Sequence, residues 1–356
     1  MSLPQCKFLI LDGISGVPLG RDVADALQAE GCTTVHFDCL AQSSRRFHGL
    51  RSAYAKARNK QADKDGFYLL PRLRGAALAA LIAQEAPTHI LVIGFIYKFF
   101  DPQDLRRLAT AGQAQLLLYD TDSCNLYDKR REFIFFIENE LPVYDRIFSF
   151  SQVTTRFFRD TRGLPACHLP YGAQPITLPA GQTKCLDALF VGSGDLRRIL
   201  LLEAIKDKVT IFGNRWTRNF PLISRELQAR ITDRPVWGQD LHRLLGQASV
   251  VLNITRSDFY GAETGVNLRI FEAVAAGCFL LTDHCDELED LFVIGQEIDT
   301  FRSARELADK LHYYLAHEDE RMAMARRGYE KLMQAHTWQI RIRHMRQQLN
   351  AGAKSS

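Results

Sequence analysis

Short apolar runs alternate with longer stretches of helical period along the whole chain. In the first half, five runs are rich in Val, Ile, Leu and Phe: KFLILDG (7–13), TTVHFD (33–38), HILVIGF (89–95), QLLLYDTD (115–122) and RIFSFS (146–151). Apolar runs that alternate with amphipathic helices predict βαβ units and a parallel sheet. We therefore expect an α/β fold in which each of these runs is a buried strand.

The alternation stops between residues 170 and 185. This segment, PYGAQPITLPAGQTKC, holds three prolines and two glycines and has neither helical nor strand period, so we interpret it as a linker. Beyond it the strand runs resume: DALFVGSG (187–194), KVTIFGN (208–214), ASVVLNI (248–254) and CFLLTD (278–283). The pattern predicts two Rossmann-like domains, residues 1–172 and 183–335, and a C-terminal helix, residues 336–356.

Two of the expected helices carry start signals. Asp101 is followed by Pro102, a typical N-cap and first helical residue. Ser303 has Glu306 three residues later, which predicts a capping box at the start of the helical last sixty residues.

Composition narrows the class of protein. Hydrophobic residues make up 46% and charged residues 24% of the chain, as in ordinary globular proteins, and no apolar run reaches the length of a membrane span. The N-terminal MSLPQCKFLILDG lacks the features of a signal peptide, so we expect a cytoplasmic protein. The eight cysteines form no CxxC pair and the ten histidines no HExxH motif, which predicts no metal site.

Positive charge is concentrated in residues 43–65, which hold seven Lys or Arg against two Asp, although the net charge of the chain is only +4. Such a run is most often a solvated helix face. The alternative is that it meets an anionic acceptor or the surface of a membrane, which would make the protein peripheral to that membrane.

Candidate chemistry lies where strands end, because ligands of open parallel sheets bind outside the carboxyl ends of the strands. The stretch GVNLRIFEAVAAGCFLLTD (265–283) places a helix start at such an end, after a polar loop that contains Tyr260. Free N–H groups there favour a phosphate, and Asn267 and Arg269 lie in or before the first turn. Glu272 suits a ribose diol, since a carboxylate accepts two hydroxyl hydrogen bonds. Alternatively, all of these polar side chains are simply solvated.

Two further strand ends are glycine-rich. Gly192 and Ser193 follow one strand and Arg197 begins the next helix, an arrangement that lets backbone approach a phosphate. The sequence GSGDLR lacks the last glycine of a dinucleotide fingerprint, and a mere tight turn is the alternative. Asn214 ends the neighbouring strand in the same way.

The C-terminal part of the chain resembles a known family. Residues 251–349 look like the C-terminal half of a GT-B glycosyltransferase, particularly the group similar to the spore-maturation protein CgeB. The matching pieces are GVNLRIFEAVAAGCFLLTD, ELEDLFVIGQEI and YYLAHEDERMAMARRGYEKLMQAHTW, with weaker echoes in FVGSGDLRR, IFGNRW, LPYGAQP and LLLYDTDSCN. The resemblance implies two facing Rossmann-like domains with a C-terminal helix that crosses back to the first.

The resemblance also implies roles. The second domain would bind a nucleotide sugar and the first an acceptor: a protein, a surface polysaccharide or a small molecule. Glu272 matches the glutamate that binds the ribose, while Arg269 and the Gly192-Ser193 turn would meet the diphosphate. Related retaining enzymes have another glutamate eight positions earlier, where this chain has Thr264, with Glu263 adjacent. The stereochemical course therefore stays open.

The expected reaction is glycosyl transfer from a nucleoside-diphosphate sugar. Its main demand is stabilisation of charge on the leaving diphosphate, which Arg269 and Arg197 would supply with no metal or other cofactor. An inverting enzyme also needs a base for the acceptor proton, for which Asp12, Asp120 and Asp122 are candidates because each follows a strand of the first domain. The alternative is that each aspartate serves as a turn or N-cap residue.

Three other functions remain open. A nucleotide-sugar epimerase of the same fold would use the donor without an acceptor. A non-catalytic module would bind the nucleotide sugar alone. Nucleic-acid binding through residues 43–65 would show steeply salt-dependent affinity, although our leading interpretation includes no nucleic acid.

Overall fold

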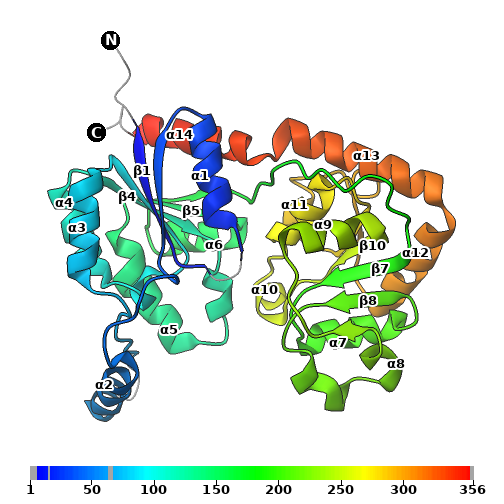
Figure 1. Ribbon diagram of the computed structural model, residues 1–356, viewed down its shortest axis with the longest axis horizontal. Coiled ribbons are helices and arrows are strands. Elements are labelled where there is room, and N and C mark those ends of the chain that lie inside the picture. Colours follow the sequence, from blue (N-terminus) through cyan, green and yellow to red (C-terminus); the bar gives the residue numbers. More distant parts are fainter. Residues whose placement is uncertain (1–5, 15–16, 63–66, 353–356) are drawn as a thin grey trace. The chain divides into compact units, whose positions relative to one another are not determined.

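The computed structural model describes residues 6–14, 17–62 and 67–352 (Figure 1). The first five residues of the N-terminal stretch and the end of the basic run, residues 63–65, lie outside the described part. The chain divides into two compact units: Met1–Pro170 with Arg341–Ser356, and Tyr171–Ile340.

The first unit is built on a six-stranded sheet of order β2-β1-β3-β4-β5-β6, in which every pair is parallel. Its strands are β1 (Lys7–Asp12), β2 (Thr33–Asp38), β3 (His89–Ile93), β4 (Gln115–Asp120), β5 (Arg146–Ser149) and β6 (Ala166–His168). Its helices are α1 (Leu19–Ala29), α2 (His48–Ala62), α3 (Gly75–Glu85), α4 (Pro102–Ala111), α5 (Arg130–Phe135) and α6 (Gln152–Arg156). Phe8 to Leu11 of β1 are all fully buried, as expected of a strand covered on both faces.

The second unit repeats this plan with the strand order β12-β11-β10-β7-β8-β9, again all parallel. Its strands are β7 (Leu186–Val191), β8 (Val209–Phe212), β9 (Ile231–Thr232), β10 (Ala248–Asn253), β11 (Leu280–Asp283) and β12 (Asp299–Phe301). Its helices are α7 (Leu196–Leu202), α8 (Arg225–Gln228), α9 (Gly238–Gln247), α10 (Ser257–Gly261), α11 (Leu268–Ala275), α12 (Ala304–Ala316) and α13 (Glu318–Ala335). The strand order reverses between β7 and β10, and such switch points are where ligands of open sheets bind.

The nine strand runs expected from the sequence all contain a strand, whereas β6, β9 and β12 were not predicted. These three have only two or three residues, too few to show a period. The two start signals are also present: Asp101 accepts from the N–H groups of Gln103 and Asp104, and the Ser303 hydroxyl accepts from that of Glu306. The Glu306 carboxylate in turn accepts from the N–H of Arg302, one residue before the cap.

The segment interpreted as a linker has no helix or strand, apart from one bridge between Ala173 and Thr337. The last helix, α14 (Trp338–Gly352), begins in the second unit and belongs to the first from Arg341 onward. As the family resemblance implied, this helix returns to the first unit, where Arg343 donates to Glu30 at 2.8 Å. Among the residues that the structure describes, no helix has the length and apolar character of a membrane span.

Candidate functional site

A pocket of about 240 Å³ opens at the carboxyl ends of β7 and β8 in the second unit. It is next to the point where the strand order reverses, since Gly192 follows β7 and Arg256 follows β10 closely. Its walls come from four loops and the first turn of α11: Val191, Gly192, Ser193, Gly213, Asn214, Arg215, Pro235, Val236, Trp237, Arg256 and Arg269. The volume is below the roughly 300–1,000 Å³ of pockets that enclose a whole small molecule. This pocket therefore fits part of a nucleotide-sized ligand.

Two glycines allow the floor of this pocket to form. Gly213 lies so close to β7 that a Cβ atom on it would stand 1.9 Å from the Gly192 carbonyl oxygen. The Gly192 N–H donates to Phe212 at 2.9 Å, and the Trp216 indole donates to the Gly192 carbonyl at 2.9 Å. The sequence led us to assign the glycine turn to phosphate approach, and the structure adds a packing reason for it: two strand ends meet here.

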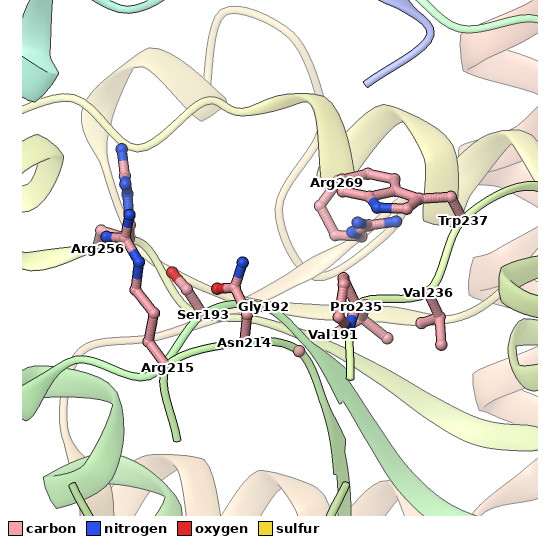
Figure 2. Close-up of a pocket in the computed structure, with 11 residues that line it drawn as sticks. Val191, Gly192, Ser193, Asn214, Arg215, Pro235, Val236, Trp237, Arg256 and Arg269 are labelled. Atoms are coloured by element: carbon pink, nitrogen blue, oxygen red, sulfur yellow. The ribbon is translucent and has the colours of Figure 1, made fainter. Parts of the chain in front are cut away.

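The lining of the pocket is strongly cationic. It includes Arg215, Arg256 and Arg269 and no acidic residue. Figure 2 shows Arg215 and Arg256 on one side of Ser193, and Arg269 beside Trp237 on the other. Three guanidinium groups without a carboxylate in the same wall favour an anionic ligand, because each guanidinium can donate two parallel hydrogen bonds to phosphate oxygens.

Arg269 also has an acidic neighbour on its own helix. Its Nη1 lies 2.7 Å from a Glu272 carboxylate oxygen, and the two side chains are only 12% and 15% exposed. The Arg269 guanidinium is 5.3 Å from the centre of the Trp237 ring. From the sequence, we expected an external anion to offset this cation in the first helical turn. In the structure Glu272 supplies that negative charge, and Glu272 does not itself line the pocket.

Arg197, Tyr260 and Asn267 do not line the pocket either. Arg197 donates from Nη1 to the buried Asp283 at 2.6 Å and stacks 3.6 Å above the Tyr260 ring. Asn267 is the N-cap of α11: its oxygen accepts from the Arg269 N–H, and its amide donates to Asn253. These three side chains hold the loops around the pocket, whereas Gly192, Ser193, Asn214 and Arg269 are the expected donor-site residues that line it.

Among the residues that sequence reasoning missed at this site are three arginines and a tryptophan. Arg215, Trp237 and Arg256 line the pocket, and the buried Arg198 supports it by donating to the Ser193 carbonyl at 2.8 Å and the Ile254 carbonyl at 2.8 Å. Burial lowers the pKa of Arg198 to about 10, so it remains charged at neutral pH. Arg215 and Arg256 follow strand ends as Arg197 does, and that signal was available from the sequence. Trp237 follows the two-residue β9, for which no strand signal exists.

In the first unit, Asp12 ends β1 and pairs with a histidine of β2. The His36 Nε2 lies 3.0 Å from Asp12 Oδ2, while Asp12 Oδ1 accepts from the Ile14 N–H at 3.0 Å. Gly20 of α1 packs against this pair, since a Cβ atom there would stand 2.1 Å from Asp12 Oδ2. Both carboxylate oxygens of Asp12 thus have partners, and Asp12 fixes the orientation of the imidazole.

The other two candidate bases lie after β4. Asp120 is buried and accepts from the hydroxyls of Ser123 and Ser149 at 2.7 and 2.9 Å, and burial raises its pKa to about 6. Asp122 is more accessible and accepts from the Asn125 amide at 2.5 Å. The carboxylates of Asp120 and Asp122 therefore shape the turn after β4.

The positions considered above for the first glutamate of retaining enzymes carry Thr264 and Glu263. Thr264 is buried and donates to Glu287 at 3.0 Å, whereas Glu263 is exposed with a φ of 55°. At the position where the resemblance implied a first glutamate in retaining enzymes, this chain thus has a hydroxyl that is bound to another carboxylate.

A buried carboxylate anchors the loop after β3 in the first unit. Glu140 accepts from the N–H groups of Ile96 and Tyr97 at 3.1 and 2.8 Å and from the Tyr144 hydroxyl at 3.0 Å. Burial raises its pKa to about 7, although these hydrogen bonds act in the opposite direction. The folded protein therefore holds a proton on Glu140 at pH values where the unfolded chain has lost it.

This pKa predicts a pH-dependent stability of the first unit. Between about pH 4.5 and about pH 7 the folded state binds the extra proton, so the contribution of Glu140 to stability falls as pH rises. Glu140→Gln removes this titration. The stability of the wild type relative to the variant should be lower at about pH 8 than at about pH 5 by roughly 3 kcal/mol. Hydrogen exchange in the peptide that contains β3 measures it, and a difference that is constant or rises with pH contradicts the assignment.

Comparison with known proteins agrees with this architecture. Residues 197–347 match the model of a family described as "Glycosyl transferase-like". No curated protein sequence matches the chain significantly.

Solved structures resemble the whole chain. Sucrose-phosphate synthase from Thermosynechococcus elongatus superposes with a TM-score of 0.63 at 14% identity, over 98% of this chain and 100% of that one. HepE from Anabaena, in complex with UDP-glucose, gives 0.61 at 12% identity, over 97% and 99%. A glycosyltransferase from Rickettsia africae gives 0.59 at 9% identity, over 99% and 100%. The expected GT-B fold, α/β with two Rossmann-like domains, is confirmed.

Proposed function

We propose that this protein is a glycosyltransferase that moves a sugar from a nucleoside-diphosphate sugar to an acceptor hydroxyl, and that the pocket of the second unit holds the diphosphate. The observation that carries the proposal is the wall of Arg215, Arg256 and Arg269, without an acidic residue, beside the β7–β10 switch point. The family match over residues 197–347 supports it, as does the UDP-glucose complex of the structurally similar HepE.

In the proposed reaction, the bond between the anomeric carbon and the diphosphate oxygen breaks, and its electron pair stays on that oxygen. The guanidinium groups stabilise the growing charge, so the proposal includes no metal or other cofactor. Glu272 is proposed to accept from the ribose hydroxyls, and in the structure it holds Arg269 in place. Of the arginines expected from the sequence, we keep Arg269 for the diphosphate. Arg197 acts through Asp283 and the loop after β10.

The first unit is proposed to bind the acceptor and take its proton. His36 suits this step better than the candidate aspartates, because Asp12 holds its Nε2 and leaves Nδ1 on the opposite side of the ring. Asp12, which the sequence offered as a candidate base, is then proposed to orient His36 as the base. Of the two aspartates after β4, Asp122 remains a candidate base, because it is more accessible than Asp120.

The resemblance to the CgeB-like group leaves the acceptor open: a protein, a surface polysaccharide and a small molecule all stay candidates. The reaction is proposed to take place in the cytoplasm.

Release of nucleoside diphosphate tests the proposal. The protein is offered UDP-, GDP-, dTDP- and CDP-sugars, with and without an acceptor extract and with a metal chelator. We expect one of the nucleoside diphosphates to be released. Its release should require the acceptor and should be equally fast with and without the chelator. His36→Gln should keep the nucleotide affinity and lower turnover, since the base acts after the donor has bound. Interconversion of sugar epimers without acceptor would instead identify an epimerase, and nucleotide binding without turnover a binding module.

A further inference from the structure

The charged residues of helix α2 and of the turn before it are all positive. Residues 39–62 contain six Lys or Arg and no Asp or Glu. Figure 1 shows α2 standing away from the sheet of the first unit. A stretch of this charge attracts an anionic surface and repels a second copy of itself.

The helix is also turned with its apolar residues outward. The half-buried side chains are His48, Ser52 and Ala55, which recur at helical spacing on one face. The His48 Nε2 donates to the Leu70 carbonyl oxygen at 3.0 Å. Leu50 and Tyr54, one turn apart, lie on the opposite face and are 73% and 69% exposed. A helix that only covers its own domain shows the reverse arrangement, with polar residues toward water.

Cations flank this exposed apolar face. Arg51 and Arg58 are exposed on one side of it and Lys56 on the other, and Phe47, 66% exposed, precedes the helix. An apolar stripe between rows of Lys and Arg is the pattern of helices that lie in the headgroup region of a bilayer. Nucleic acid would use the cations and the aromatic rings, but it would give Leu50 no partner.

We propose that α2, with Phe47, docks the first unit on an anionic lipid bilayer. In this arrangement Phe47, Leu50 and Tyr54 enter the boundary between headgroups and acyl chains, while the flanking Arg51, Lys56 and Arg58 contact the lipid phosphates. This surface lies outside the nucleotide pocket and goes beyond the proposed function, because it assigns a membrane contact to a region that the transfer reaction does not use.

Flotation with vesicles tests the proposal on the full chain. The vesicles are phosphatidylcholine alone, or phosphatidylcholine mixed with phosphatidylglycerol. We expect binding to the mixed vesicles only, weakened by salt. Leu50→Ser with Tyr54→Ser should lower the vesicle affinity about tenfold or more, although every cation is kept. Both side chains are exposed, so the variant should unfold at the wild-type temperature.

The second unit offers a matched control. Leu196 and Leu200 of α7 are also one turn apart and are 56% and 65% exposed. Leu196→Ser with Leu200→Ser should leave vesicle binding unchanged. The proposal is overturned if the protein does not bind the anionic vesicles, or if the α2 variant binds them as the wild type does. It is also overturned if that variant instead loses self-association or loses affinity for single-stranded RNA, which would identify a second copy or a nucleic acid as the partner.

Discussion

Turnover of the protein should fall by roughly 10²–10³-fold when Arg269 is replaced by alanine. The guanidinium lines the pocket, and charge on the leaving diphosphate is largest in the transition state, so its loss affects turnover more than ground-state binding. Steady-state release of nucleoside diphosphate measures this. A variant with activity close to the wild type would remove Arg269 from the diphosphate site.

The same substitution should also lower stability. From the sequence alone, a cation in the first turn of a helix is unfavourable by roughly 0.3–1 kcal/mol, so its removal would leave stability unchanged or slightly raised. The structure changes this expectation, because Arg269→Ala leaves the half-buried Glu272 without its partner at 2.7 Å. We expect a loss of roughly 1–3 kcal/mol.

Arg243 provides the control for both effects. It forms the same kind of pair with Asp240, three residues earlier on α9, but the side chains are exposed and outside the pocket. Arg243→Ala should change stability and turnover little. If Arg243→Ala matches Arg269→Ala, the loss reflects a helix pair in general and not the pocket.

The second large effect is expected at Gly213. In Gly213→Ala the new methyl group would overlap the Gly192 carbonyl, 1.9 Å away, so β7 and β8 would have to separate and the Gly192 to Phe212 hydrogen bond would break. Because overpacking against backbone has no flexible side chain to absorb it, we expect a loss of at least roughly 3 kcal/mol and no measurable nucleotide binding.

Urea unfolding followed by tryptophan fluorescence measures this loss in the correct unit, since Trp216, Trp237 and Trp338 all belong to the second unit. Gly295→Ala is the control: Gly295 has a φ of +77° and no atom within 4 Å of a new Cβ. It should cost only the backbone strain of about 1–2 kcal/mol. Equal losses in the two variants would show that the approach of the two strand ends is not what requires Gly213.

The long strands were predictable because parallel strands are buried on both faces and therefore appear as unbroken apolar runs, as Phe8 to Leu11 do. β9 has two residues, and its sequence carries no such signal. Trp237, which follows β9, was missed for the same reason. Because β9 was not predicted, the sequence-based site lacked the wall of the pocket to which Trp237 belongs.

The choice among polar residues could not be made from spacing alone. Arg197 and Arg198 are adjacent and both follow a glycine turn, yet one pairs with Asp283 and the other is buried under Ser193. Asn267 was expected at the ligand and is instead the cap of α11. Which side chain reaches the pocket depends on side-chain direction and on partners distant in sequence, such as Asp283, that no local pattern encodes.

The pocket after β7 and β8 is proposed to bind the diphosphate of a nucleotide sugar. A crystal structure of the protein with the nucleoside diphosphate that it releases tests this most directly. We predict both phosphates beside Gly192 and Ser193, within hydrogen-bond distance of at least two of Arg215, Arg256 and Arg269. A nucleotide whose phosphates lie elsewhere, or an empty pocket at saturating nucleotide, would contradict it.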